Sequence, residues 1–321
     1  PCAACGTAST NHDPIRRGIM SLPNFFIIGA AKSGTSSLYM YLKQHPEIYM
    51  SPVKEPHFFS FDAQSKLTKG PGDPIPNAIT DFEQYRSLFD GVCDEKAIGE
   101  ASTSYLYRPE AAHRIHDVLP GAKLIAILRN PAERAFSAYM HVVRDGRETA
   151  GSFSEALKLE DARKKDNWDP IWHFTSVGRY YEQLARYYQR FSRDQIKIFL
   201  YQELLNRQQA LLEESFRFLG VNPNFTPDSS VKFNISGEQK SQVLYKLFKS
   251  IFNHPNPVRW ISRYIIPERW RWKVTNWVRE RNLKDNQIPP EKKSELITFY
   301  RPEILRLEQL IEKDLSHWLE E

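Results

Sequence analysis

The residues best suited to chemistry lie in a glycine-containing loop at residues 29–37, which reads GAAKSGTSS. An apolar run typical of a buried strand precedes this loop, and apolar residues at helical spacing follow it. A loop of this kind directs several backbone N–H groups and the positive end of a helix dipole towards one point, which suits an anion. The sequence therefore predicts a phosphate-binding loop.

The lysine of this loop is displaced from its place in the triphosphate-binding pattern G-x-x-x-x-G-K-[ST]. Gly34 and Ser36 fit the second glycine and the hydroxyl, but Thr35 stands where the lysine belongs, and Lys32 lies inside the loop. The lysine of that pattern serves the β- and γ-phosphates, with magnesium held by the hydroxyl and a distant aspartate. No predicted strand ends in an obvious aspartate of that kind. We therefore expect Lys32 to neutralise a single phosphate and its bridging oxygen without a metal.

A second anion-binding element is predicted at residues 129–137, which read RNPAERAFS. Arg129 directly follows a predicted strand, so its guanidinium is expected at the carboxyl edge of the sheet, and Ser137 lies one to two helical turns further on. Together the guanidinium fork and the hydroxyl suit a second phosphate. Arg134 is the competing candidate, with pairing to a carboxylate on the helix surface as its alternative role.

Three side chains are candidates for a proton acceptor. Glu55 and His57 are two residues apart, so in an extended segment they share one side. His57 either orients Glu55, acts as the base itself, or packs against the phenylalanines that follow it. Glu100 ends a predicted strand and is a candidate base, acceptor ligand or partner for Lys32.

The elements that position these residues alternate between strand and helix. Strands are predicted over 25–28, 97–100, 123–128 and 196–201, and helices over 38–45, 133–143, 178–191 and parts of 291–320. This alternation predicts an α/β fold: one P-loop-like domain over residues 21–321 with a central parallel sheet flanked by helices, and a helical C-terminal part at 241–321. Ligands of such sheets bind outside the carboxyl ends of the strands. The polar segment 62–80 is expected near the mouth of the site.

Composition places limits on the function. The 321 residues are 41% hydrophobic and carry a formal net charge of +5, which permits an anionic ligand but is too small to indicate a nucleic-acid partner. Three cysteines cannot staple a chain of this length, so a reducing, cytoplasmic location is expected. No apolar run approaches the ~18 residues that a membrane span needs. Residues 1–20 are expected to be a linker or an expression-derived segment.

Three ordered motifs together resemble the sulfotransferases that use 3′-phosphoadenosine 5′-phosphosulfate (PAPS). Residues 26–37 resemble the 5′-phosphosulfate loop of that family, the segment KEPHFF at 54–59 resembles its KExHFF element, and residues 129–137 resemble its 3′-phosphate motif. A weaker likeness covers residues 178–191. The resemblance implies that the 5′-phosphosulfate is bound by Lys32, Ser33, Gly34, Thr35, Ser36 and Ser37, the 3′-phosphate by Arg129 and Ser137, and the adenine near Gly237 and Lys240.

The resemblance also implies the reaction, which is transfer of a sulfuryl group to an acceptor hydroxyl. It assigns the base to Glu55, while Lys32 suits the charge that gathers on the leaving phosphate. The acceptor is predicted to be a carbohydrate or a β-hydroxyacyl chain on an acyl carrier protein, with a bacterial polyketide-type enzyme favoured. The alternatives are a P-loop kinase and an inactive phosphonucleotide-binding protein. The segment 256–282, rich in Arg and Trp, is either a helical cap or a surface that grips an anionic partner.

Overall fold

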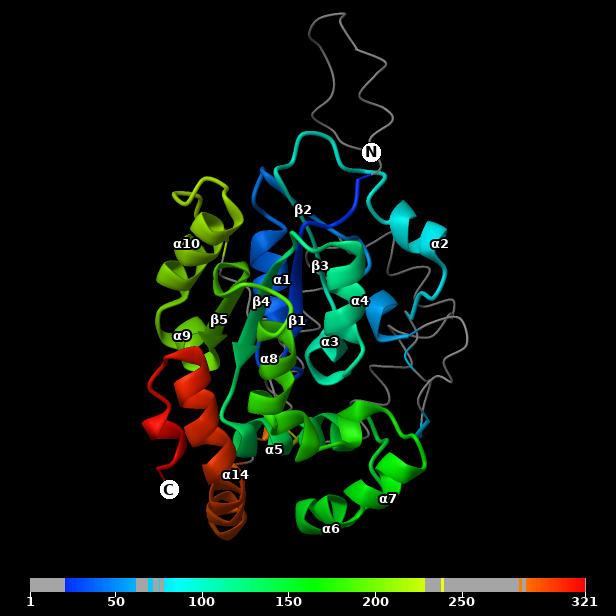
Figure 1. Cartoon of the computed structure of the whole chain (residues 1–321). Coiled ribbons are helices and arrows are strands. Elements are labelled where there is room, and N and C mark those ends of the chain that lie inside the picture. The colour runs from blue at the N-terminus through cyan, green and yellow to red at the C-terminus, as the bar shows by residue number, and fades with distance from the viewer. Residues whose placement is uncertain are drawn as a thin grey trace, which may run out of the picture.

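A five-stranded parallel sheet forms the centre of the computed structural model, which describes residues 21–61, 69–71, 75, 78–228, 238–239, 283–284 and 287–320 (Figure 1). Its strands are β1 (Phe25–Gly29), β2 (Ile48–Met50), β3 (Ala97–Ala101), β4 (Lys123–Leu128) and β5 (Ile196–Leu200). They lie in the order β2-β3-β1-β4-β5, and all neighbouring pairs are parallel. The predicted fold class is confirmed.

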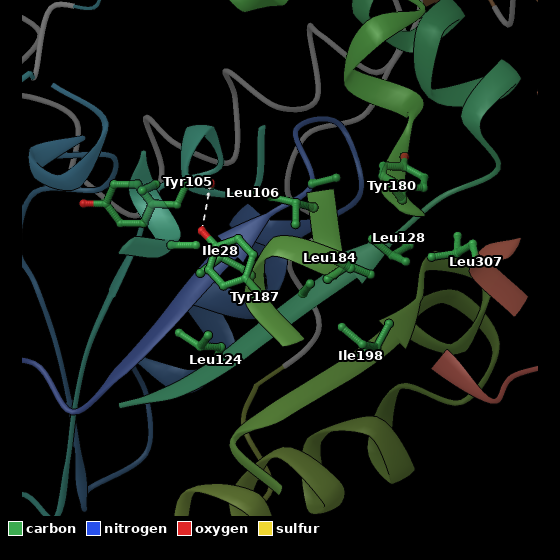
Figure 2. Packing of buried hydrophobic residues seen from close by; sticks show 14 of the residues in the cluster. Ile28, Tyr105, Leu106, Leu124, Leu128, Tyr180, Leu184, Tyr187, Ile198 and Leu307 are labelled. Carbon is green, nitrogen blue, oxygen red and sulfur yellow. Dashed lines mark hydrogen bonds between the residues drawn. The ribbon is translucent and has the colours of Figure 1, made fainter. Parts of the chain in front are cut away.

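Helices cover both faces of this sheet. On one face, α1 (Thr35–Leu42) and α10 (Gln208–Leu219) pack on the strands. The other face is covered by a larger set: α3 (Ser104–Tyr107), α4 (Ala111–Val118), α5 (Pro131–Arg144), α8 (Tyr180–Tyr188) and α14 (Pro290–Ile311). Figure 2 shows this second layer, in which Leu184 and Tyr187 of α8 lie over the strands and the Tyr187 hydroxyl donates to the Tyr105 carbonyl at 2.8 Å.

The sheet is buried on both sides because its strands are apolar at successive positions. Side chains alternate between faces along a strand, so Phe25 and Ile27 pack with α1 and α10, whereas Phe26 and Ile28 pack with the other helices. All four side chains are 0% exposed. A continuous apolar run is the pattern expected of a central parallel strand, and it fixes where the loop after β1 emerges.

The predicted elements match the structure with small shifts in their bounds. Asn130 caps α5 by accepting from the Ala132 N–H at 3.0 Å, so the helix begins at Pro131 rather than at residue 133. The strand β2 was not predicted, because three residues are too few to show a pattern. The remaining described elements include α2 (Phe82–Ser87), α6 (Phe153–Lys158), α7 (Glu160–Lys165), α9 (Tyr201–Asn206) and the antiparallel pair β6 (Glu238–Gln239) and β7 (Leu283–Lys284).

Several predictions fall on residues outside the described ranges. They are the linker at 1–20, the adenine contacts Gly237 and Lys240, and the segment 256–282. Within the described part of the C-terminal region, α14 is the long helix, and the predicted helical character holds there. Among the helices that the structure describes, none combines the length and the apolar character needed to span a bilayer.

Candidate active site

The loop between β1 and α1 lies where the order of the sheet reverses. From β1 the chain passes to β2 and β3 on one side, and later to β4 and β5 on the other, so the loops after β1 and β4 meet at one crevice. Gly34 adopts φ 89°, and a Cβ there would come within 2.5 Å of a Leu204 methyl carbon. Glycine is therefore required both by the backbone conformation and by the close approach of α9.

A cavity of about 590 Å³ opens in front of this loop. Most of the predicted anion-binding residues line it, namely Lys32, Gly34, Thr35, Ser36, Ser37 and Arg129. Two predicted contacts do not line it: Ser33 is 0% exposed and Ser137 is 5% exposed. The structure therefore brings the two predicted anion-binding motifs to one cavity, although they are about a hundred residues apart in the sequence.

The electrostatics of this cavity favour an anion. Burial, together with the positive charges of Arg144 and Arg129, lowers the pKa of Lys32 to about 8, and Asp145 opposes this effect. Lys32 is thus still mainly protonated at neutral pH. Arg129 donates from Nε to Glu133 at 3.1 Å, and its guanidinium carbon lies 4.8 Å from the centre of the Tyr201 ring. The Arg129 guanidinium is therefore held by protein contacts, and Lys32 contributes a buried positive charge to the same cavity.

Glu55 is tied to the end of β3. Its backbone N–H donates to the Ala101 carbonyl at 2.8 Å. Its carboxylate accepts hydrogen bonds from the Lys54 ammonium and from the Thr103 hydroxyl, the latter at 3.4 Å. Burial raises the pKa of Glu55, but Lys54, His57 and the Thr103 hydrogen bond outweigh this and hold the pKa below its ordinary value. With 32% of its side chain exposed, Glu55 is an ionised carboxylate open to a ligand.

His57 belongs to a chain of hydroxyl and imidazole groups that ends on Glu55. Its Nδ1 lies 2.6 Å from Ser104 Oγ, which lies 2.6 Å from Ser60 Oγ, and its Nε2 lies 3.5 Å from Glu55 Oε2. Burial lowers the pKa of His57, although Glu55 opposes this. A neutral ring with Nε2–H facing the carboxylate and Nδ1 accepting from Ser104 satisfies every member of this chain. Of the roles left open by the sequence, orienting Glu55 fits this geometry.

The side chains of Glu55 and His57 lie close together, as predicted, but their backbone conformation differs from the predicted one. Both residues adopt left-handed conformations, with φ 61° and φ 57°, rather than the extended one on which the prediction rested. Such conformations are uncommon for residues other than glycine and require support from surrounding structure. That support comes from the Glu55 N–H bond to β3 and from the His57 N–H, which donates to Ser102 Oγ at 3.1 Å.

Glu100 lies beneath the site rather than in it. The side chain is 0% exposed and lines neither of the cavities described here. Its carboxyl oxygens accept from the hydroxyls of Tyr105 at 2.5 Å, Tyr85 at 3.1 Å and Ser102 at 3.1 Å. Burial raises the pKa of Glu100 to about 7, against these hydrogen bonds. The structure therefore places it as a support for the turn that carries Glu55 and His57.

A second cavity of about 360 Å³ adjoins the first. The two share wall residues, namely Ala31, Glu55, Thr103, His141 and Ile171. The second is otherwise lined mainly by residues of the KEPHFF segment, α3 and the region around residue 170, and Arg134 lines it as well. Arg134 therefore belongs to the second cavity and does not compete with Arg129 for the first. Ile75 also lines it, whereas most of the predicted segment 62–80 lies outside the described residues.

His141 is a site residue that the sequence analysis missed. It lines both cavities, its Nδ1 lies 2.5 Å from Arg144 Nη2, and its Nε2 lies 3.6 Å from Asp145 Oδ2. Burial and the charges of Lys32, Arg144 and Arg147 lower its pKa to about 3, with Asp145 opposing, so it is neutral. A signal existed, because His141 follows Ser137 by four residues and therefore shares its face of α5.

Comparisons with known proteins agree with this arrangement. A family model described as "Sulfotransferase family" matches residues 23–227. A crystal structure of a sulfotransferase from Alicyclobacillus acidocaldarius is 38% identical, covers 94% of this chain and 100% of that one, and superposes with a TM-score of 0.73.

Curated relatives include a mouse bifunctional heparan sulfate N-deacetylase/N-sulfotransferase 4, which is 30% identical over 66% of this chain, and mouse carbohydrate sulfotransferase 15, which is 28% identical over 63% of it. These matches span 24% and 44% of the relatives' own lengths, so the chain corresponds to less than half of either protein. The family match covers well over half of the chain, including the loop after β1, the KEPHFF segment and the Arg129 motif. The chain belongs to the sulfotransferase family of enzymes.

Proposed function

We propose that this protein transfers the sulfuryl group of PAPS to a hydroxyl group of a carbohydrate. The observation that carries the proposal is the position of Glu55 on the wall between two cavities. One cavity holds the phosphate-type loop and Arg129, and the other has room for an acceptor. A carboxylate at that boundary can reach a hydroxyl that faces the nucleotide.

The residues of the first cavity fit an anionic nucleotide with phosphates at both ends. The loop offers the N-terminal N–H groups of α1 and Lys32 at one end, and Arg129 offers a guanidinium at the other. PAPS would supply an activated sulfuryl group and a phosphate leaving group. Lys32 would provide the positive charge that stabilises that leaving phosphate, and burial strengthens its effect.

Glu55 would accept the proton of the acceptor hydroxyl. It is ionised at neutral pH because Lys54, His57 and Thr103 hold its pKa low. His57, fixed through Ser104, would keep the carboxylate in one orientation towards the shared wall. Proton removal by a positioned carboxylate contributes typically ~10²–10⁴-fold to rate.

A carbohydrate acceptor is favoured by the relatives that align over about two thirds of the chain, since their names refer to heparan sulfate and carbohydrate substrates. A carrier-bound β-hydroxyacyl acceptor and a cytoplasmic location remain predictions from the sequence alone. An assay of sulfuryl transfer from labelled PAPS can separate the two acceptors, because polysaccharide and carrier-protein products differ in size and in sensitivity to thioester cleavage.

The first test is calorimetric titration of the full chain with 3′-phosphoadenosine 5′-phosphate (PAP) in EDTA, beside ATP as a control. Metal-free binding of PAP that depends on the 3′-phosphate supports the proposal. Binding of ATP alone, and only with magnesium, would contradict it and favour the kinase alternative.

The second test follows sulfuryl transfer from labelled PAPS to desulfated polysaccharides. Glu55→Gln should keep PAP affinity within about twofold and lose ~10²-fold or more in turnover. The matched control is Glu83→Gln, since Glu83 is a surface residue of α2 that pairs with Arg86 and lines neither cavity. Normal turnover in Glu55→Gln would show that another group is the base.

A further inference from the structure

The second cavity carries an excess of positive charge. Among the residues that the structure describes, four cationic side chains line it, Lys54, Arg108, Arg134 and Arg147, against two carboxylates, Glu55 and Asp169. Lys54 and Arg147 each have a partner within the described structure. Lys54 contacts the Glu55 carboxylate, and Arg147 donates from Nε to the Pro71 carbonyl at 2.7 Å.

Arg108 has guanidinium nitrogens without a hydrogen-bond acceptor among the described residues. Its Nε and Nη2 atoms are buried and have no hydrogen-bond acceptor among the described residues. The guanidinium carbon lies 5.0 Å from the centre of the Phe61 ring, which holds the plane of the group in place. Burial lowers the pKa of Arg108, and the charges of Asp169 and Glu110 only partly oppose this.

Arg134 adds a second buried donor to the same wall. The residue is 1% exposed, and its Nη2 donates to the Phe174 carbonyl, but its Nε has no acceptor within the described ranges. A buried charged donor without an acceptor destabilises the folded protein. Such groups are normally satisfied. Two residues that line this cavity therefore carry three guanidinium nitrogens that lack an acceptor within the described ranges, which points to an acceptor supplied by a ligand.

We propose that the acceptor carries an oxyanion, such as a carboxylate or a phosphate, that is bound by Arg108 with Arg134 beside it. This inference rests on the proposed function, because it concerns the same acceptor cavity. A guanidinium presents a planar fork of donors that matches an oxyanion, and the pairing is strongest where water is excluded. Arg108 would thus select among acceptors, while Glu55 performs the chemistry on the hydroxyl.

The test measures binding of two matched probe pairs to the full chain saturated with PAP, which blocks the nucleotide cavity. The carboxylate pair is p-nitrophenyl β-D-glucuronide against p-nitrophenyl β-D-glucoside, and the phosphate pair is glucose 6-phosphate against glucose. We expect at least one charged probe to bind about 10-fold or more tightly than its neutral partner, from the usual strength of a charged hydrogen bond. The pair that shows the larger ratio identifies the type of oxyanion.

Arg108→Gln should reduce that ratio to about one while leaving PAP affinity unchanged, and Arg108→Lys, which keeps the charge without the fork, should retain part of it. Arg86→Gln is the matched control, because Arg86 pairs with Glu83 and Asp90 on the surface of α2. Equal binding of charged and neutral probes by the wild type, no binding of either charged probe, or a ratio that survives Arg108→Gln would overturn the inference.

Failure of the proposed function has a different signature. It would appear as an absence of PAP binding in the separate nucleotide titration. The probe ratios can then still be measured on the free chain and still decide whether Arg108 binds an oxyanion.

Discussion

The substitution Glu100→Gln should change how stability depends on pH. Glu100 is fully buried, and hydroxyl groups of Tyr85, Ser102 and Tyr105 surround its carboxyl oxygens. No cation contacts it in the described part of the structure. Glutamine keeps the shape and can both accept from and donate to those hydroxyls, since a hydroxyl serves as donor or acceptor. The substitution therefore removes one titration while retaining the packing.

The sign and size of the effect follow from the pKa of Glu100. Burial raises it from the ordinary 4.5 to about 7, so the folded state holds the proton more tightly than the unfolded state does. Below pH 4.5 both states are protonated and the group costs nothing. As pH rises towards 7 the unfolded chain ionises first, and wild-type stability falls. Above pH 7 the full penalty of ~3 kcal/mol is reached and stays constant.

The assay is urea unfolding of wild type and Glu100→Gln between pH 5 and pH 8, followed by tryptophan fluorescence. The difference in unfolding free energy should shift by ~2.5 kcal/mol in favour of the glutamine variant across this range, because the unfolded chain is already partly ionised at pH 5 and contributions from other groups cancel. Glu47→Gln is the control. Hydrogen bonds from Lys96 and Asn222 lower the pKa of Glu47, so its titration falls below this pH window and its difference should be flat.

A pH-independent difference between wild type and Glu100→Gln would refute the reasoning. It would mean that the Glu100 carboxyl group is either in contact with water or paired with a positive charge, in contrast to the buried environment described above. A shift of the opposite sign would require a cation beside Glu100.

Other substitutions test the cavity that holds the loop. Because the pKa of Lys32 is about 8, kcat/KM should fall as pH rises above 8. Lys32→Arg should move that fall to higher pH. A pH profile unchanged by the substitution would show that Lys32 is not the group that titrates. Gly34→Ala should lose ~1–3 kcal/mol of stability in a denaturant titration, whereas Gly121→Ala, where an added Cβ meets nothing within 4 Å, should not; equal losses would show that the loop tolerates a side chain. Arg129→Gln should remove the preference for PAP over adenosine 5′-phosphate in calorimetry, and an intact preference would place the 3′-phosphate elsewhere.

The loop and the Arg129 motif could be predicted because their chemistry is local in sequence. Lys32 and Gly34 lie within one loop, and Arg129 immediately follows an apolar strand, so the rule for carboxyl ends of parallel strands places them together. His141 could not be found in this way. Its helical spacing from Ser137 places both residues on one face of α5, but which face meets the cavities depends on how α5 lies across the end of the sheet.

Glu100 illustrates a second limit. Its place at the end of β3 was predicted correctly, but the end of a strand does not reveal which side of the sheet a side chain takes. In the parallel register Glu100 is opposite Phe26, whose ring packs with the larger helical layer. Side chains at paired positions share a face. The Glu100 side chain therefore points into that layer, where the hydroxyls of Tyr85 and Tyr105 donate to its carboxyl group.

The left-handed residues around the site explain why residue type could be predicted more readily than geometry. Lys32, Glu55 and His57 all have positive φ, a conformation that costs ~1–3 kcal/mol for residues other than glycine. Nothing in their local sequence favours it. The backbone N–H groups of the last two donate to the Ala101 carbonyl of β3 and to Ser102 Oγ, and these long-range hydrogen bonds exist only once the sheet has formed. The types of residue at this site could be predicted from the chemistry proposed for them, whereas their conformations depend on the tertiary contacts that hold them in place.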